Sequence, residues 1–428
     1  MFISKRAFDS FVNVLRGLGG SKDVTYQRRY AISRIMSMAF DELNNLYATN
    51  WIAGKIVDIP VNDALRQGRI IQGDQAAEIY KVYDHFKIDT KIGNALKWSR
   101  AFGGAVLVIV SNDNDMAMPL SVGKGDLKNI AVFDVSDIIG GDMIRDPLSP
   151  HYLSFEYYNI KGSTQRVHRS RVIKIDGYTT SNRVKELMRG FGLSIFEKIY
   201  GVIGDAQESN DLITNLLHQS NIDVYKINGL NQTVGDGASA VATERIQIAQ
   251  QMKSILNAIV LDKDDDYINN AKNFSNLHEI DMGKLSKVAG AADIPLTRLL
   301  GKSADGMNAT GEGDLKNYYD NIASYQTDVI YDIYKAIDAV VCAHLGVPMP
   351  EFSFNSLFQL TDTQIADLEL KRAQTDTIHI NNGVIDEYDV MERIAASGIY
   401  PTVTPERIKQ LRASSGEIGE YGDLPDEY

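Results

Sequence analysis

The sequence predicts an α+β fold, in which long helices pack around one strand-rich region. Apolar residues recur every three or four positions over residues 194–219 and 314–345, which is the pattern of amphipathic helices. Apolar and aromatic runs separated by turn residues occur instead at 105–110 and 130–177, which is typical of strands. A meander of strands with helices packed against it accounts for both patterns.

Four elements are predicted before the strand-rich region. Apolar spacing predicts a peripheral helix over 2–18, which could alternatively dock a partner, and helical structure over 40–71 with Pro60 marking a helix boundary. One further helix is expected from Ala76 to Phe102, followed by a buried strand from Ala105 to Val110.

The strand-rich region runs from Ile130 to Gly177. Residues 152–160 form one predicted strand, and residues 167–175 form the strand that returns beside it. Glycine and proline turns separate these segments.

The next helix begins at a capping box, because Ser194 is followed three residues later by Glu197. It is expected to continue to about Gln219 and to be roughly 40 Å long at 1.5 Å per residue. A smaller unit is predicted after it. Its elements are a strand (222–227), a Gly- and Ala-rich loop (233–240), a helix (243–255), a hairpin turn (262–266) and a returning helix (282–300).

The most informative segment is the polar, glycine-rich loop from Gly301 to Gly313. It is held between the helix that ends at Leu300 and a long helix that begins near Asp314 and ends at Gly346. No acid, base or nucleophile cluster surrounds the loop in the sequence. The loop is therefore either a flexible connection or a mobile element on two rigid arms that touches a ligand.

The C-terminal part predicts an extended segment and three helices. The extended segment is 352–360, two helices occupy 363–378 and 386–396, and a third begins at Thr404 with Pro405 in its first turn. The acidic tail from Ser414 to Tyr428 has no basic residue and is expected to be disordered.

Composition narrows the class of function. A chain of 428 residues is long enough for two to four packed units, and its net charge of −12 argues against a basic face that grips nucleic acid. It does not exclude contact with DNA that must slide, because an acidic surface repels phosphates and avoids tight binding. Cys342 is the only cysteine, so no disulfide or cysteine metal site forms within the chain. Neither a signal peptide nor a membrane span is expected.

Three chemical motifs in the sequence lack residues that the corresponding sites require. Gly301-Lys302-Ser303 resembles the end of a P-loop, but Leu296 stands where the first glycine is needed. Asp262, Asp264 and Asp266 resemble calcium ligands, but the required Gly and Glu are replaced by Tyr267 and Asn273. No histidine pair has metal-ligand spacing, and no cofactor is expected.

Two H-x-S triplets, which begin at His168 and His218, leave an enzymatic alternative open. Paired H-x-S/T motifs on facing strands catalyse phosphodiester chemistry in one enzyme superfamily, with the histidines as acid and base. Here the first triplet falls on a predicted strand and the second at a predicted helix end. The alternative function is therefore an anti-defence phosphodiesterase. A third alternative is a head–tail adaptor or scaffold-like protein, which the chain length disfavours.

Several stretches, in this order, resemble the portal proteins of tailed phages, and one subgroup of prophage-type portals in particular. The resemblance extends from about Asp41 to Ile394. The stretches are Leu46-Tyr47, Ile56–Arg66 (IVDIPVNDALR), Val167–Ile173 (VHRSRVI) closing on Gly177, Gly190–Ser194 (GFGLS), Ile294-Pro295 with Leu299–Gly301, and Gly306–Asp314 (GMNATGEGD).

The resemblance implies a portal fold with a division into named parts. These are a β-rich N-terminal wing (1–193), a stem helix (194–219), an α/β clip (220–281), a second stem helix (282–300), a tunnel loop (301–313), a long spine helix with a following strand (314–362), a helical crown (363–413) and the acidic tail (414–428).

It also implies a non-enzymatic ring at one capsid vertex, through which double-stranded DNA is packaged and ejected. The expected partners are identical subunits in a homododecamer, the terminase large subunit, the major capsid and scaffolding proteins, and a head-completion adaptor. The protein would lie in the virion, after assembly in the host cytoplasm.

Site residues follow from the same resemblance. Those expected to face DNA in the tunnel loop are Lys302, Ser303, Asn308 and Thr310, and the loop hinges would be Gly301, Gly306, Gly311 and Gly313. Those expected to face terminase and connector proteins in the clip are Lys226, Asn228, Asp262, Lys263 and Asp264.

Overall fold

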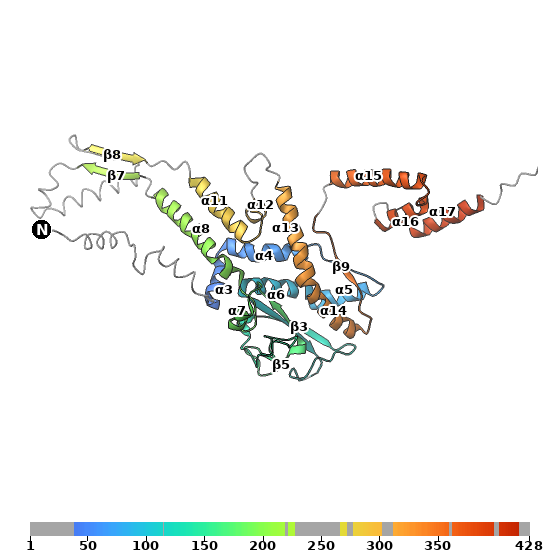
Figure 1. Ribbon diagram of the computed structural model, residues 1–428, viewed down its shortest axis with the longest axis horizontal. Coiled ribbons are helices and arrows are strands. Elements are labelled where there is room, and N and C mark those ends of the chain that lie inside the picture. The colour runs from blue at the N-terminus through green and yellow to red at the C-terminus, as the bar shows by residue number, and fades with distance from the viewer. Residues whose placement is uncertain are drawn as a thin grey trace, which may run out of the picture. The chain divides into compact units, whose positions relative to one another are not determined.

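The computed structural model of the chain (Figure 1) confirms a mixed helix and sheet architecture. It describes residues 38–113, 115–218, 221–226, 266–271, 277–301, 311–358, 362–397 and 402–418. The chain divides between Leu357 and Phe358 into two compact units. The predicted N-terminal helix over 2–18 lies outside the described residues.

The core of the first unit is a three-stranded antiparallel sheet. Its central strand is β2 (Gly104–Ser111), with β3 (Leu127–Asp134) on one side and β6 (Val172–Asp176) on the other. Helix α6 (Ile88–Phe102) packs against β2 and β3. The prediction of a buried strand at 105–110 is confirmed, because every residue of β2 except Val110 is buried.

The predicted long pair of strands at 152–160 and 167–175 is wrong in its extent. Only β4 (Tyr157–Asn159) and β5 (Arg166–His168) pair with each other. A 3₁₀ turn at Arg169–Arg171 then redirects the chain, and β6 pairs with β2 instead. The turn forms because the Arg171 side chain is fully buried and bonded to a neighbouring loop, which holds the backbone out of a continuous strand.

The helices over 40–71 are α3 (Phe40–Thr49) and α4 (Trp51–Leu65), and they are separated by Asn50. The predicted boundary at Pro60 is wrong, since Pro60 lies inside α4. A proline deprives the carbonyl four residues earlier of its helical donor, which here is the Ile56 carbonyl. That oxygen accepts a hydrogen bond from Arg100 Nη2 at 3.1 Å, so the helix continues past the proline.

The single helix predicted over 76–102 is also wrong. The segment forms α5 (Ala76–Phe86) and α6, because Lys87 takes the left-handed conformation with φ 51° and ends α5. Before α5, the short strand β1 (Arg69–Ile71) pairs with β9 (Phe352–Phe354), which joins residues almost 300 positions apart. Helix α7 (Asn182–Leu187) follows the sheet.

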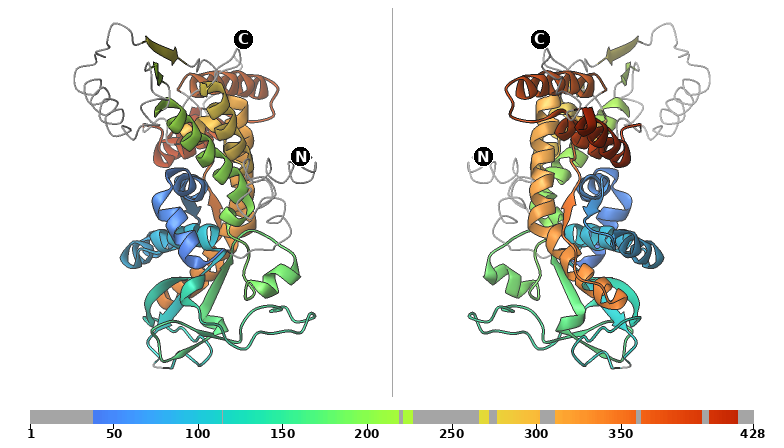
Figure 2. Two further views of the ribbon diagram at one scale, coloured as in Figure 1. Left: turned by 90° about the vertical axis from the view of Figure 1, so that its left-hand side faces the viewer. Right: turned by 90° about the vertical axis from the view of Figure 1, so that its right-hand side faces the viewer.

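Helix α8 (Ile195–His218) confirms the predicted capping box. Ser194 Oγ accepts from the Phe196 amide at 3.0 Å, and Glu197 Oε2 accepts from the Ser194 amide at 3.0 Å. Helix α11 (Leu277–Ala291) lies beside α8 (Figures 1 and 2). The predicted returning helix 282–300 is therefore wrong in its bounds.

The returning helix breaks after Ala291. Asp293 has a positive φ of 56°, and Pro295 precedes the separate short helix α12 (Leu296–Leu300). The residue before a proline is kept out of the helical region, which accounts for the break.

Between α8 and α11 the structure describes two antiparallel strands, β7 (Asn221–Lys226) and β8 (Asp266–Ala271). The predicted strand at 222–227 is thus confirmed to within one residue. The predicted loop at 233–240, the helix at 243–255 and residues 262–265 of the hairpin turn lie outside the described residues.

The predicted long helix is confirmed, with one irregularity. It consists of α13 (Glu312–Tyr325), a π-helical turn (Gln326–Ile330) and α14 (Tyr331–Leu345), and it ends at Gly346 with φ 73°. The buried Gln326 side chain of the π turn donates to the Ala64 carbonyl at 2.6 Å. That carbonyl belongs to the last turn of α4, where helices lack backbone partners.

The second unit contains α15 (Asp362–Asn381), α16 (Glu387–Ser397) and α17 (Pro405–Ile418). An Arg393–Asp376 ion pair links α16 to α15 and lowers the pKa of the Asp376 carboxyl. The predicted disordered tail from Ser414 is wrong for its first residues, because α17 continues to Ile418. Residues 419–428 lie outside the described chain.

A buried ion pair between Arg69 and Asp338 joins β1 to α14. Asp338 on α14 is 0% exposed and accepts from Arg69 Nη1 at 2.5 Å, Arg69 Nη2 at 2.7 Å and the Tyr83 hydroxyl at 2.7 Å. The guanidinium also lies 4.1 Å from the Tyr334 ring centroid. A buried charge must be paired and hydrogen-bonded, so this contact ties β1, α5 and α14 together.

Replacing Asp338 with Asn should therefore lower the free energy of unfolding by about 3–5 kcal/mol, because Arg69 would keep a buried charge without a counter-ion. Urea denaturation followed by circular dichroism measures this. The control is Asp332→Asn, at an exposed position of the same helix, which should change stability by about 0.5 kcal/mol or less. Equal losses in the two variants would contradict the assignment.

Candidate functional site

The glycine-rich loop begins and ends at residues in the left-handed conformation. Gly301 caps α12 with φ 70°, and Gly311 precedes α13 with φ 57°. Glycine adopts this conformation without the steric cost that other residues incur. Gly313 lies in the first turn of α13, so the helix starts before the predicted end of the loop. The other predicted loop residues, Lys302, Ser303, Gly306, Asn308 and Thr310, lie outside the described residues.

One buried carboxylate holds both arms of the loop. Asp63 on α4 is 1% exposed. Its two oxygens accept from Arg298 of α12, at 3.0 Å from Nε and 2.7 Å from Nη2. One oxygen also accepts from the Tyr318 hydroxyl of α13 at 3.0 Å. The helices before and after the loop are thus fastened to the same side chain, and we call this contact the Asp63 clamp.

Two further contacts close the base of the loop. Lys55 Nζ donates to the Leu299 carbonyl at 2.8 Å, which satisfies an oxygen in the last turn of α12. A Cβ added to Gly311 would lie 3.3 Å from Thr297 Cγ2, so the end of the loop returns to the helix from which it left. The described residues therefore form a rigid base for the loop.

The clamp keeps its donors protonated over a wide range of pH. The hydrogen bond to Asp63 raises the pKa of Arg298, although partial burial opposes it. Burial first, and then the charge and hydrogen bond of Asp63, raise the pKa of the Tyr318 hydroxyl. Both groups remain donors at neutral pH, so the clamp does not release by losing a proton from either of them.

The sequence-based site residues did not include Asp63, Arg298 or Tyr318. A signal for Asp63 was present, because this acid stands in the apolar stripe of α4, between Pro60, Val61 and Ala64, which are all buried. An acid in a buried stripe indicates a charge that needs a partner. The identity of that partner, 235 residues away, was not readable from the spacing.

The predicted clip residues are only partly placed. Lys226 is the last residue of β7, and its backbone pairs with Asp266 of β8. Asn228, Asp262, Lys263 and Asp264 lie outside the described residues. Their proposed role as a docking surface stays a prediction.

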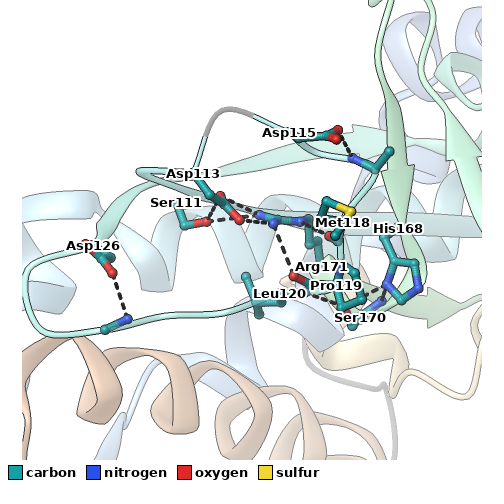
Figure 3. Close-up of polar contacts among 12 residues, drawn as sticks. Ser111, Asp113, Asp115, Met118, Pro119, Leu120, Asp126, His168, Ser170 and Arg171 are labelled. Carbon is teal, nitrogen blue, oxygen red and sulfur yellow. Dashed lines mark hydrogen bonds and ion pairs between the residues drawn. The ribbon is translucent and has the colours of Figure 1, made fainter.

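His168, the first histidine of the two H-x-S triplets, is used in a local turn (Figure 3). Its Nδ1 lies 2.9 Å from Ser170 Oγ and accepts from the Ser170 amide at 3.2 Å. Ser170 Oγ in turn accepts from the Leu120 amide at 2.7 Å. The Nε2 atom of His168 is 3.9 Å from Glu156. The histidine thus caps the 3₁₀ turn after β5.

The neighbouring Arg171 carries most of the polar contacts of this region (Figure 3). Its guanidinium is fully buried and donates to the Met118 carbonyl at 2.7 Å, to Ser111 Oγ at 2.9 Å and to the Asp113 carboxylate. The hydrogen bond from Arg171 is the largest cause of the lowered pKa of Asp113. Every one of these contacts holds the loop after β2 in place, which is a structural role.

The two H-x-S triplets begin on different elements, at the end of β5 and at the end of α8. His218 is the last residue of α8, about 35 Å along that helix from its first residue. In Figure 1, β5 lies below the start of α8, and α8 runs away from it. Acid–base catalysis by a histidine pair requires both rings within hydrogen-bond reach of one phosphate, whereas these two histidines belong to separate elements, β5 and the far end of α8.

Two other classes of site are absent from the described part of the chain. It contains no group of three or more His, Cys, Asp or Glu side chains that could hold a metal ion. None of its helices combines the length and the apolar character needed to span a membrane.

Comparison with known proteins identifies the family. The family described as phage portal protein matches residues 41–378. An uncharacterized protein of Haemophilus influenzae is 27% identical over 98% of this chain and 96% of its own length.

Two further relatives carry the name anti-CBASS protein Acb1. The Caulobacter protein is 30% identical over 78% of this chain, and the Sphingomonas paeninsulae protein is 29% identical over the whole of it. The matched regions span only 56% and 72% of those two proteins.

Among solved structures, a chain in the neck of an empty GTA particle is similar to this protein, with a TM-score of 0.50 and 12% sequence identity. The match covers 86% of this chain and 97% of the GTA chain. An HK97 family phage portal protein from Corynebacterium diphtheriae matches 74% of this chain and is 95% covered, at 10% identity and a TM-score of 0.38. The GTA neck match shows a shared fold.

Because the family match covers most of the chain, from residue 41 to residue 378, this protein belongs to the phage portal protein family.

Proposed function

We propose that this protein forms a ring of identical subunits, a homododecamer, at a unique vertex of a phage capsid, and that double-stranded DNA passes through the ring during packaging and ejection. The observation that carries the proposal is the family match over residues 41–378. The proposed location is the virion, where the protein would be a structural component, after assembly in the host cytoplasm.

The Asp63 clamp supports a role for the loop at the channel wall. It holds α12 and α13 on one carboxylate, so Gly301 and Gly311, at the two ends of the loop, are joined to a common base. Lys302 is the only basic residue between these glycines. Each subunit therefore offers the DNA one weak phosphate contact, and the net charge of −12 disfavours tight binding. Weak contacts repeated around a ring allow sliding.

The paired helices α8 and α11 support the assignment of a stem. They lie side by side and carry the β7–β8 strands between them, which is the arrangement expected of a stem that ends in a clip. We propose that the clip docks the terminase large subunit first and a head-completion adaptor later. The second unit, from Phe358, would form the crown that faces the capsid interior, and the wing would contact the major capsid and scaffolding proteins.

The alternative function is a phosphodiesterase that counters a host defence system, and the names of two relatives favour it. The geometry speaks against it, since His168 caps a turn and His218 ends a distant helix. The matched regions also leave a large part of both relatives without a counterpart in this chain. A structural role without catalysis is therefore the better proposal.

Electron microscopy of the purified protein tests the ring directly. We expect annular particles of about twelve subunits, because portal assemblies close on themselves by cyclic symmetry. Mass measurement across a wide range of protein concentration gives the copy number. A chain that stays monomeric or dimeric at every concentration would sink the proposal.

Changing Lys302 to Gln tests the loop. Rings should form as in the wild type, whereas DNA packaging should slow by about fivefold or less, which is the effect of losing one exposed charge contact per subunit. Packaging is measured as nuclease-protected DNA in capsids. The control is Lys316→Gln, an exposed lysine on α13 that undergoes the same loss of charge. If both variants package DNA equally well, the charge of Lys302 does not contribute to packaging.

Changing His168 to Ala tests the enzymatic alternative. The variant should lose about 1 kcal/mol of stability, from one turn-capping hydrogen bond, and should show the same absence of phosphodiester cleavage as the wild type. Cyclic and linear oligonucleotides are suitable substrates, and thermal unfolding measures the stability. The enzymatic function would be supported instead if the wild type cleaved either substrate and His168→Ala abolished that cleavage without disturbing assembly.

A further inference from the structure

The strand-rich part of the first unit carries a surface cavity that has no part in the functions described so far. The cavity has a volume of about 490 Å³. One wall consists of residues 139–143 and Arg145, the floor contains Phe155, and the other wall consists of Glu186 of α7 and Arg189, which follows that helix. Both walls are largely exposed, so the cavity is open to a partner.

The first wall is an extended segment with an unpaired backbone edge. Met143 forms an isolated antiparallel bridge with Phe155, and the flanking hydrogen bonds, from the amides of Ile144 and Glu156, are 2.8 and 3.2 Å long. In a bridge flanked in this way, the amide and carbonyl of the bridged residue point away from the partner strand. Within the described chain, neither of these groups of Met143 makes a hydrogen bond. An open strand edge is a surface to which an extended peptide can add.

Arg189 closes one end of this edge. The Ile138 carbonyl, five residues before Met143, accepts from Arg189 Nη1 at 3.3 Å. Arg189 has a positive φ of 54°, and strained residues of this kind are often found where ligands are held. Between Ile138 and Met143 the wall includes Gly140 and Gly141, which have no side chain to keep another backbone away.

Four charged side chains line the cavity, two of each sign. Arg145 and Arg189 are the cations, and Asp142 and Glu186 are the anions. None of the four belongs to an ion pair within the described residues. Charges of both signs are therefore available to a partner along the two walls.

Apolar surface lies between these charges. The Phe155 side chain in the floor is 4% exposed, and Met143 lies beside it. Ile139 in the first wall is 65% exposed, which is unusual for a large aliphatic side chain. An apolar floor inside a charged rim is the ordinary composition of a protein-binding surface.

We propose that this cavity binds an extended segment of the capsid shell protein, which adds along the backbone edge at Met143 and places an apolar side chain over Phe155. The proposal rests on the proposed ring and names a surface through which the ring would meet the shell. A segment with an acidic and a basic residue flanking the apolar one matches both pairs of charges in the lining. The acidic tail of this chain, which has no basic residue, would satisfy only the two arginines.

The position of the cavity favours the shell over DNA as the partner. Figures 1 and 2 show the strands and α7 on the side of α6 away from α12 and α13, which hold the two ends of the glycine-rich loop. In a ring whose loops line the channel, this side of each subunit faces away from the DNA. The shell surrounds the ring on that side.

Photo-crosslinking in assembled capsids identifies the occupant. Benzoylphenylalanine in place of Ile139, in rings of the full chain, should cross-link to one peptide of the shell protein, which mass spectrometry maps. The same group in place of Ile280, which is 50% exposed on α11, is the control and should not cross-link to that peptide. Cross-links from position 139 only to another copy of this chain, or none at all, would overturn this inference and leave the ring standing. The absence of any ring would overturn both.

A charge reversal gives a quantitative test. Arg145→Glu places a third acid in the lining, so the fraction of capsids that contain a ring should fall by about tenfold or more, while rings form as in the wild type. Quantitative mass spectrometry of purified capsids measures this fraction, and circular dichroism checks that the variant folds.

Arg183→Glu is the matched control, since Arg183 is exposed on α7, lies outside the lining and undergoes the same reversal of charge. It should leave incorporation unchanged. The proposal fails if folded, ring-forming Arg145→Glu is incorporated into capsids as well as this control.

Discussion

The Asp63 carboxylate is the contact on which the arrangement of the functional segment depends. It is removed from water, so its charge requires donors, and the two it uses come from the helices on either side of the glycine-rich loop. Both helices that flank the loop are therefore held at a fixed position relative to α4. Asp338 on α14 acts in the same way. It accepts hydrogen bonds from Arg69 of β1 and Tyr83 of α5, and so joins α14 to these two earlier elements. In each case one buried acid joins elements from distant parts of the chain.

Backbone carbonyls that lack a donor within their own helix accept hydrogen bonds from side chains. Pro60 frees the Ile56 carbonyl, and Arg100 of α6 binds it. The end of α4 leaves the Ala64 carbonyl without a backbone partner, and Gln326 of the π turn supplies a donor. The end of α12 leaves the Leu299 carbonyl, which Lys55 binds. Each donor belongs to the junction between α4 and the later helices.

This bracing agrees with the proposed role in a ring. A channel wall must keep its shape while a charged polymer moves along it, and buried contacts hold the helices on both sides of the loop. The two relatives named anti-CBASS protein are 30% and 29% identical to this chain, and in this chain His168 caps the turn before Arg171. A motif in the sequence acquires chemical meaning only when the fold brings its members together.

The sequence by itself determined the α+β class, the buried strand at 105–110, the capping box at Ser194 and Glu197 and the course of the long helix, because these features depend on residues within a few positions of one another. Only the tertiary structure decided the breaks and continuations of the helices: the passage through Pro60, the end of α5 at Lys87 and the interruption after Ala291. It also decided the partners of Asp63 and Arg171. The physical reason is that local spacing fixes which face of a helix is apolar, whereas a buried charge or a freed carbonyl is satisfied by whichever donor or acceptor the fold brings to it.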